Sequence, residues 1–162
     1  MKLRNAAIGC AVAGTLASAS AWGSCFYLLE QNASGLGRAF SGTAAIADDA
    51  STIFFNPAGL ARLEGLRVSA AASAINVNTR FGNSGSVAAL GQPLGGSGGN
   101  AGGLATVPAM YLSVPFAGSW TFGLGVNAPF GLKTDYDAGW IGRFQALRSE
   151  VKTINVNPTL AW

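Results

Sequence analysis

Apolar residues alternate strictly with small or polar residues over positions 119–130, and this pattern limits what the chain can fold into more than any other feature of the sequence. Its apolar and aromatic residues share one parity: Trp120, Phe122, Leu124, Val126, Ala128 and Phe130. Small and polar residues share the other parity: Ser119, Thr121, Gly123, Gly125 and Asn127. Because successive side chains of a β-strand point to opposite faces, the pattern predicts a strand with lipid or a core on one side and a polar lumen on the other. Pro129 has no backbone N–H, so the strand must kink, bulge or end there.

Three further segments with a period of two predict additional antiparallel strands, at residues 66–81, 105–116 and 148–162. The connections are long, short and long in turn: a Gly-rich loop over 82–103, a turn at 117–119 and a polar loop over 133–147. Long outer loops and short periplasmic turns are typical of outer-membrane barrels. Trp120 and Trp162 should then lie at the same periplasmic level and on the apolar parity, as an aromatic girdle requires.

The composition favours a β membrane protein and excludes several classes of enzyme. Charged residues make up 10% of the 162 residues, against about 25% in an average soluble domain. After the N-terminal segment, no apolar run reaches the roughly 18 residues that a membrane-spanning helix needs. The chain has no His, which removes His ligands, His bases and Ser-His or Cys-His catalytic pairs. We therefore expect no catalytic site, no metal site and no cofactor.

The N-terminal segment, residues 1–23, is predicted to be a secretory signal peptide. Lys2 and Arg4 form its positive region, an apolar stretch follows, and cleavage is expected after Ala21 or after Gly23. The formal charge of +3 includes these two cations, and no basic patch remains elsewhere, so we expect no nucleic-acid partner. Cys25 is left without a second cysteine after cleavage, and we interpret it as a small near-terminal residue rather than a redox or lipid site.

Residues 24–65 suit neither a long helix nor a strand, and they predict a compact plug that needs a surrounding wall. Small residues dominate between Glu30 and Leu63, and the stretch ends in the turn-forming sequence Asn56-Pro57-Ala58-Gly59. Its charged residues Arg38, Asp48 and Asp49 are expected to form salt links that fix the plug to the wall. Adjacent carboxylates such as these more often accept hydrogen bonds at turns and caps than act in catalysis.

Two points stay open at this stage. The apolar start of the mature chain, Phe26, Tyr27, Leu28 and Leu29, could simply pack or could be a movable latch. Four strands also cannot close a barrel, since even the smallest barrels use about eight and an open sheet in lipid leaves unsatisfied edges. Residues 66–162 are therefore expected to be the first four strands of a truncated barrel, or less readily a sheet that other chains complete.

The plug and the later strands resemble the FadL family of outer-membrane transporters for long-chain fatty acids and hydrocarbons. Five segments carry the resemblance: Ser34-Gly35-Leu36-Gly37-Arg38-Ala39-Phe40-Ser41-Gly42, Ala44–Thr52, Asn56–Gly59, Gly125–Leu132 and Thr153–Pro158. The resemblance implies an all-β transmembrane barrel whose lumen is closed by an N-terminal hatch with the motif Asn56, Pro57 and Ala58. It also implies that the third strand kinks inward at Asn127, Ala128, Pro129, Phe130 and Gly131, and that the kink opens a gap in the wall.

The same resemblance implies a function. The expected role is uptake of long-chain fatty acids or other hydrophobic compounds across the outer membrane of a Gram-negative bacterium, by lateral diffusion through the gap into membrane lipid. Phe26 to Leu29 would act as the hatch latch and ligand gate. The expected partners are the apolar small molecule and outer-membrane lipid, with no obligate protein partner. The alternative is a nonselective porin or a surface adhesin on the same scaffold, with the Gly-rich loop presented to partners.

Overall fold

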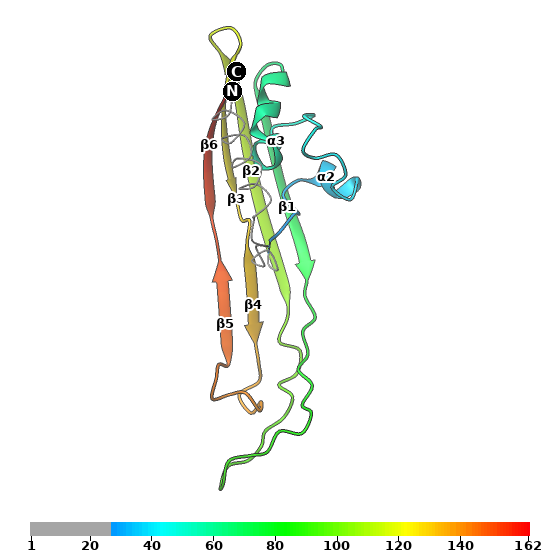
Figure 1. The fold of residues 1–162 in the computed structure, drawn as a ribbon, viewed down its shortest axis with the longest axis vertical. Helices are drawn as coiled ribbons and strands as arrows, with labels where there is room; N and C mark the ends of the chain where they lie inside the picture. The colour runs from blue at the N-terminus through cyan, green and yellow to red at the C-terminus, as the bar shows by residue number, and fades with distance from the viewer. Residues whose placement is uncertain (1–26) are drawn as a thin grey trace, which may run out of the picture.

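The fold consists of a small helical unit that lies on one face of a long antiparallel sheet (Figure 1). A computed structural model describes residues 27–162, so the expected signal peptide, Cys25 and Phe26 lie outside the described residues. The helical unit contains α2 (Ala33–Gly37), α3 (Thr52–Phe55) and the 3-10 helix η1 (Pro57–Arg62). The strands are β1 (Arg67–Asn76), β2 (Leu104–Phe116), β3 (Trp120–Asn127), β4 (Gly131–Asp135), β5 (Arg148–Lys152) and β6 (Asn155–Ala161). No helix in the described part of the chain is long and apolar enough to cross a membrane.

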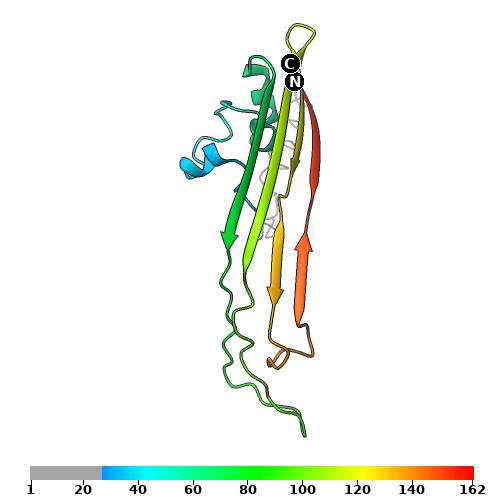
Figure 2. The same ribbon diagram turned by 180° about the vertical axis from the view of Figure 1, so that it is seen from behind.

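The strands form two antiparallel sheets that follow one another along the same direction (Figures 1 and 2). The larger sheet has the order β1-β2-β3-β6, and the smaller one pairs β4 with β5. Beyond the break after Asn127 the chain resumes as β4, and β5 leads into β6 across Thr153 and Ile154. The prediction of a loop from residue 133 is wrong at its start, because Lys133 to Asp135 belong to β4. The single strand predicted over 148–162 is likewise two strands.

The two faces of the larger sheet differ as the alternation predicts. Residues of the polar and small parity are buried on the face that carries the helical unit: Ser113, Thr121, Gly123, Gly125 and Asn127. Side chains of the apolar parity point away from it and are exposed, including Met110, Phe122, Val126 and Leu160. Trp120 and Trp162 lie side by side on this outer face, with ring centroids 6.2 Å apart. The prediction of one apolar and one polar face is confirmed.

The helical unit, here called the hatch (residues 27–65), packs through two fully buried side chains. Ile53 of α3 and Leu60 of η1 have no exposed surface; both rest on β3 at Gly123, and Ile53 also contacts Gly125. A Cβ atom added at Gly123 would lie 2.6 Å from Leu60 Cδ1 and 2.9 Å from Ile53 Cδ1. β3 therefore has glycine at the positions where side chains of the hatch pack directly against its backbone.

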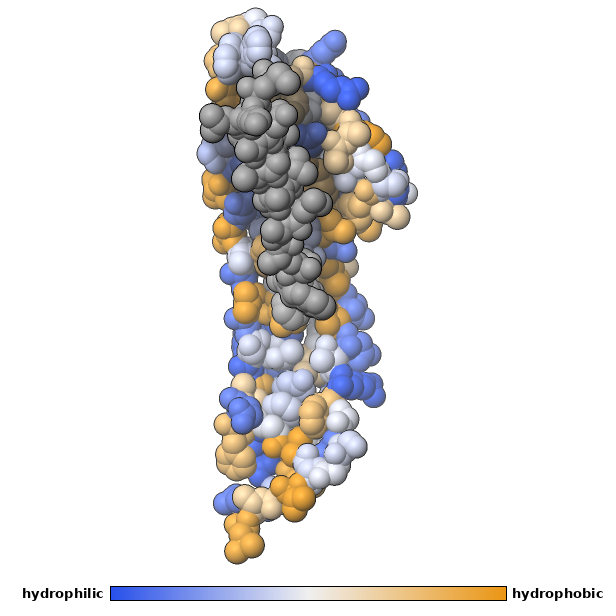
Figure 3. Space-filling view, in the orientation of Figure 1, coloured by the Kyte–Doolittle hydropathy of each residue, from blue (hydrophilic) through white to orange (hydrophobic). Residues whose placement is uncertain are grey.

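The long connections lie at one end of the molecule, opposite the short turn after Phe116 (Figure 1). Arg143 ties them together, since its Nη2 donates to the carbonyl of Pro93 at 2.7 Å in the Gly-rich loop. Trp140 stacks on Tyr136 and packs edge-on against Phe81. The tip of the Gly-rich loop is apolar, and Val87 and Leu90 are almost fully exposed there (Figure 3).

Candidate functional site

The wall formed by the strands is interrupted where β3 ends. Pairing between β2 and β3 stops at Ala109 and Asn127, whereas pairing between β1 and β2 continues as far as Asn76 and Leu104. Among the described residues β4 pairs only with β5, so the segment Leu104–Pro108 of β2 has no strand partner on that side. We call this interruption the wall break.

Two prolines lie where the ladder stops. Pro129 is two residues beyond the end of β3, and Pro108 occupies β2 one residue beyond its last pair with β3. Neither residue has a backbone N–H, so neither can donate a ladder hydrogen bond. Sequence reasoning noted Pro129 but missed Pro108, although a proline inside a predicted strand is a readable signal.

The opposite side of the break stays connected through one threonine. Thr153 Oγ1 donates to the carbonyl of Phe130 at 2.8 Å and accepts from the N–H of Phe130 at 3.0 Å. The backbone N–H of Thr153 also donates to the same carbonyl at 3.3 Å. A side chain thus replaces the ladder between β3–β4 and β5–β6, and the opening is confined to the β2 side.

The start of the hatch lies against the break and satisfies backbone groups that the lost ladder leaves free. The N–H of Leu28 donates to the carbonyl of Pro129 at 2.9 Å. Gln31 is fully buried, and its Nε2 donates to the carbonyls of Ala128 at 3.1 Å and Leu28 at 3.0 Å. Buried carbonyls require such partners, so the hatch stands in for the missing strand neighbour. No sequence signal singled out Gln31.

Aromatic contacts reinforce this arrangement. The ring of Tyr27 stacks on Phe54 of α3 at 5.7 Å and meets the ring of Phe130 edge-on at 5.6 Å. The structure therefore brings Tyr27 and Leu28 of the expected latch onto Ala128, Pro129 and Phe130 of the expected kink. Leu29 is partly exposed, and Phe26 lies outside the described residues.

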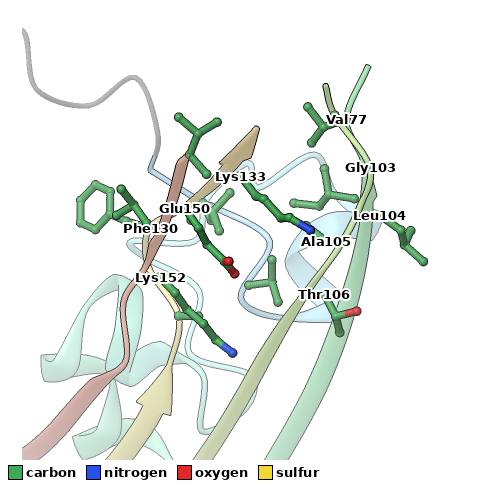
Figure 4. A pocket seen from close by; sticks show the side chains of 17 residues that line it. Val77, Gly103, Leu104, Ala105, Thr106, Phe130, Lys133, Glu150 and Lys152 are labelled. Atoms are coloured by element: carbon green, nitrogen blue, oxygen red, sulfur yellow. The ribbon is translucent and has the colours of Figure 1, made fainter. Parts of the chain in front are cut away.

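A cavity of about 500 Å³ lies beside the wall break, between the ends of β1 and β2 and the strands β4 and β5 (Figure 4). Part of its lining is apolar: Leu28, Ile75, Val77, Leu104, Val107 and Phe130. The other part carries three charged side chains, which are Lys133, Glu150 and Lys152. The cavity is thus amphipathic, and Leu28, at the start of the hatch, forms part of its lining.

The motif Asn56, Pro57 and Ala58 lies away from these contacts and organises the hatch itself. Asn56 Oδ1 accepts from the N–H of Ala58 at 3.3 Å and so caps η1, whose first residue is Pro57. Asn56 Nδ2 donates to the carbonyl of Ala44 at 2.7 Å. All hydrogen bonds of Asn56 in the described part of the chain stay within the hatch.

In the described part of the chain, the charged residues of the hatch do not form the expected salt links to the wall. Arg38 pairs with Asp48 at 2.8 Å, and both residues belong to the hatch and are partly exposed. Asp49 accepts from Ser34 Oγ at 2.9 Å and from the N–H of Ser51 at 2.8 Å. Partial burial alone would raise the pKa of Asp49, but hydrogen bonds from Ser51, Ser34 and Ser69 outweigh it and hold the pKa below its usual value.

Comparison with known proteins adds three findings. Residues 14–162 match the family described as "Outer membrane protein transport protein (OMPP1/FadL/TodX)". The "Long-chain fatty acid transport protein" of Escherichia coli is 33% identical over 149 residues, covering 91% of this chain and 32% of that protein. "Outer membrane protein P1" of Haemophilus influenzae is 32% identical over 159 residues, covering 91% of this chain and 34% of that protein.

A solved structure shows the same likeness. The crystal structure of a Pseudomonas aeruginosa FadL homologue superimposes with a TM-score of 0.62 at 26% identity, covering 83% of this chain and 33% of that one. The chain thus spans about a third of the length of the relatives that it matches.

Proposed function

The chain belongs to the outer membrane protein transport protein family (OMPP1/FadL/TodX), and we propose that it takes up long-chain fatty acids or other hydrophobic compounds through the break in its wall. Its location is the outer membrane of a Gram-negative bacterium. Its fold is that of an outer-membrane β-barrel, of which the described residues form the hatch and part of the wall.

One observation carries the proposal: an amphipathic cavity opens beside an interruption of the wall. Each CH₂ group of an acyl chain gains roughly 0.8 kcal/mol on leaving water, so such a chain enters an apolar cavity readily. Moving the acyl chain back into a water-filled lumen would cost the same free energy for each CH₂ group. A sideways exit, from the cavity past Pro129 into membrane lipid, avoids water throughout.

The hatch contacts support a gate in the same place. Tyr27 and Leu28 occupy the inner side of the break, and Leu28 also lines the cavity. In the proposed mechanism the N-terminal end of the hatch moves, the bonds of Leu28 and Gln31 to the broken strand open, and the cavity becomes continuous with the break. The rest of the hatch stays seated on Gly123 and Gly125 and prevents leakage.

The test is to repair the strand. Replacing Asn127–Gly131 with alternating Val and Thr in the full-length protein should restore a continuous ladder and abolish uptake of radiolabelled oleate, while insertion into the outer membrane stays intact. Pro158→Thr is the matched control, because it replaces a strand proline of β6 outside the break. Undiminished uptake by a correctly inserted repaired variant would contradict the lateral route.

A further inference from the structure

A one-residue change of register marks the wall break on the side of β5 and β6. Asn127 is opposite Asn155 at the end of β3, and Gly131 is opposite Lys152 at the start of β4. The strand that runs from β3 into β4 thus advances four residues, from 127 to 131, while its neighbour covers three, from 155 to 152. An extra residue of this kind is a β-bulge, which bends a strand and can end its pairing.

Thr153 holds this bulge through Phe130. Its Oγ1 accepts from the N–H of Phe130 at 3.0 Å and donates to the carbonyl of Phe130 at 2.8 Å, and its own N–H donates to the same carbonyl at 3.3 Å. A hydrogen-bonded pair in an antiparallel ladder exchanges one N–H···O bond in each direction. Thr153 makes the same exchange with its side-chain oxygen in place of a backbone acceptor. Both backbone groups of Phe130 are therefore bonded on the side of β5 and β6.

The other neighbour of Phe130 is the edge of β2 that has no partner among the described strands. If the pairing of β2 with β3 continued in register beyond Ala109 and Asn127, Phe130 would be opposite Thr106. A free strand edge readily pairs with any strand that can reach it. Figure 4 instead shows Phe130 and Thr106 on opposite sides of the cavity. The bonds to Thr153 thus compete with a pairing that would close the wall break.

The hatch also contacts this segment, but its contacts are the ones that open in the proposed gate. The N–H of Leu28 donates to the carbonyl of Pro129, and Nε2 of Gln31 donates to the carbonyl of Ala128. The bonds of Thr153 to Phe130 involve no hatch residue, so they remain when the end of the hatch moves. At that moment they are the contacts that keep the segment away from β2.

We propose that Thr153 is a positioning residue, whose hydroxyl holds the bulge at Phe130 and keeps the wall break open after the end of the hatch has moved. The proposal rests on the proposed function and adds to it the residue that maintains the exit. Without the hydroxyl, the N–H of Phe130 loses its acceptor, and the segment turns to the free edge of β2 at Leu104–Val107.

The experiment compares Thr153→Val, which has nearly the same shape but no hydroxyl, with Thr153→Ser, which keeps the hydroxyl. Full-length variants are tested for insertion, for uptake of radiolabelled oleate and for hydrogen exchange of the peptide that contains residues 104–107. Because two hydrogen bonds are lost, Thr153→Val should lower uptake about tenfold and slow the exchange of this peptide. Thr153→Ser should match the unmodified protein. Thr134→Val is the matched control, because it makes the same replacement on β4, where Thr134 pairs with Ser149.

The outcomes separate this proposal from the proposed function. If the unmodified protein takes up no oleate, the transport function itself fails. If it takes up oleate and Thr153→Val does so equally well, the positioning role is overturned and transport stands. Faster exchange of residues 104–107 in Thr153→Val would mean that Thr153 only supports the fold, and reduced uptake by Thr153→Ser would mean that the hydroxyl is not the active group. Either result overturns the proposal. Should Thr153→Val fail to insert, Thr153→Ala is measured in its place, and the same exchange result decides.

Discussion

Asp49 lies at the centre of a hydrogen-bond network inside the hatch. Ser34 and the N–H of Ser51 donate to its carboxylate, and Asn32 in turn donates to the hydroxyls of both serines. Asn32 also caps α2 by accepting from the N–H of Gly35 at 3.0 Å. A single carboxylate thus orders the loop around α2 and the start of α3, and its charge is part of the hatch's stability.

The lowered pKa of Asp49 makes hatch stability depend on pH. Because the folded-state pKa lies below the ordinary value of 3.8, the ionised carboxylate stabilises the hatch fully above that pH. The contribution is lost as pH falls through the folded-state pKa. Hydrogen-exchange protection factors of hatch peptides, corrected for intrinsic exchange, should therefore fall at a pH below 3.8.

Asp49→Asn should remove this acid dependence and lower hatch protection at neutral pH by about 1.5 kcal/mol, since hydrogen bonds to a charged acceptor become neutral ones. Asp48→Asn, which alters the exposed ion pair with Arg38, should keep the acid dependence. Identical pH profiles for Asp49→Asn and the unmodified protein would refute the role of Asp49.

Between elements, the main contact is α3 and η1 against β3 and β6. Ile53 and Leu60 fit over Gly123 so closely that no side chain could be added there without displacing them. Asn157 of β6 adds a hydrogen bond of 3.4 Å to the carbonyl of Ile53, and Ser69 of β1 accepts from the N–H of Ala50 at 3.1 Å. Within residues 27–162, packing and hydrogen bonds, rather than ion pairs, hold the hatch to the wall.

Gly123→Val should unseat the hatch while the barrel still inserts. The added side chain overpacks the contact with Ile53 and Leu60, and such overpacking costs about 1–3 kcal/mol. Protease cleavage after Arg62, followed by mass spectrometry, should become faster in the variant. Val126→Phe adds more bulk on the exposed face of the same strand and should leave cleavage unchanged. Equal cleavage of Gly123→Val and the unmodified protein would show that the contact does not seat the hatch.

At the scale of the whole molecule, the described sheet is a wall segment with an apolar outer face and two edges. β1 and β6 each pair on one side only among residues 27–162, and the hatch covers the inner face. In a closed barrel of this family the hatch would occupy the lumen. The buried contacts of Gln31, Ile53 and Leu60 favour a plugged barrel over a nonselective porin.

Measurements of ion conductance distinguish a plugged barrel from a nonselective porin. Full-length protein reconstituted in planar bilayers should show little steady ion flow, because the hatch fills the lumen. Gly123→Val should raise the conductance by loosening the hatch, and Val126→Phe should not. Steady ion flow through the unmodified protein would favour the porin alternative.

The sequence by itself determined the parity of the strands and the place where β3 breaks, and it indicated the turns of the hatch. These properties follow from local backbone chemistry: a period of two fixes the faces, Pro129 removes a donor, and small residues with Asn56-Pro57 form turns. The sequence did not reveal β4, because the charges of Lys133 and Asp135 resemble those of a loop, and it did not separate β5 from β6.

Only the tertiary structure decided what lies against what. Gln31 meets Ala128 across 97 residues, Lys152 is opposite Gly131 across a strand pair, and Pro108 and Pro129 both lie just beyond the last pair of β2 and β3. No local pattern encodes such pairings, because they arise when distant segments share one register and one cavity. The candidate site consists almost entirely of contacts of this kind, so the sequence predicted its kink and latch separately but not that they meet.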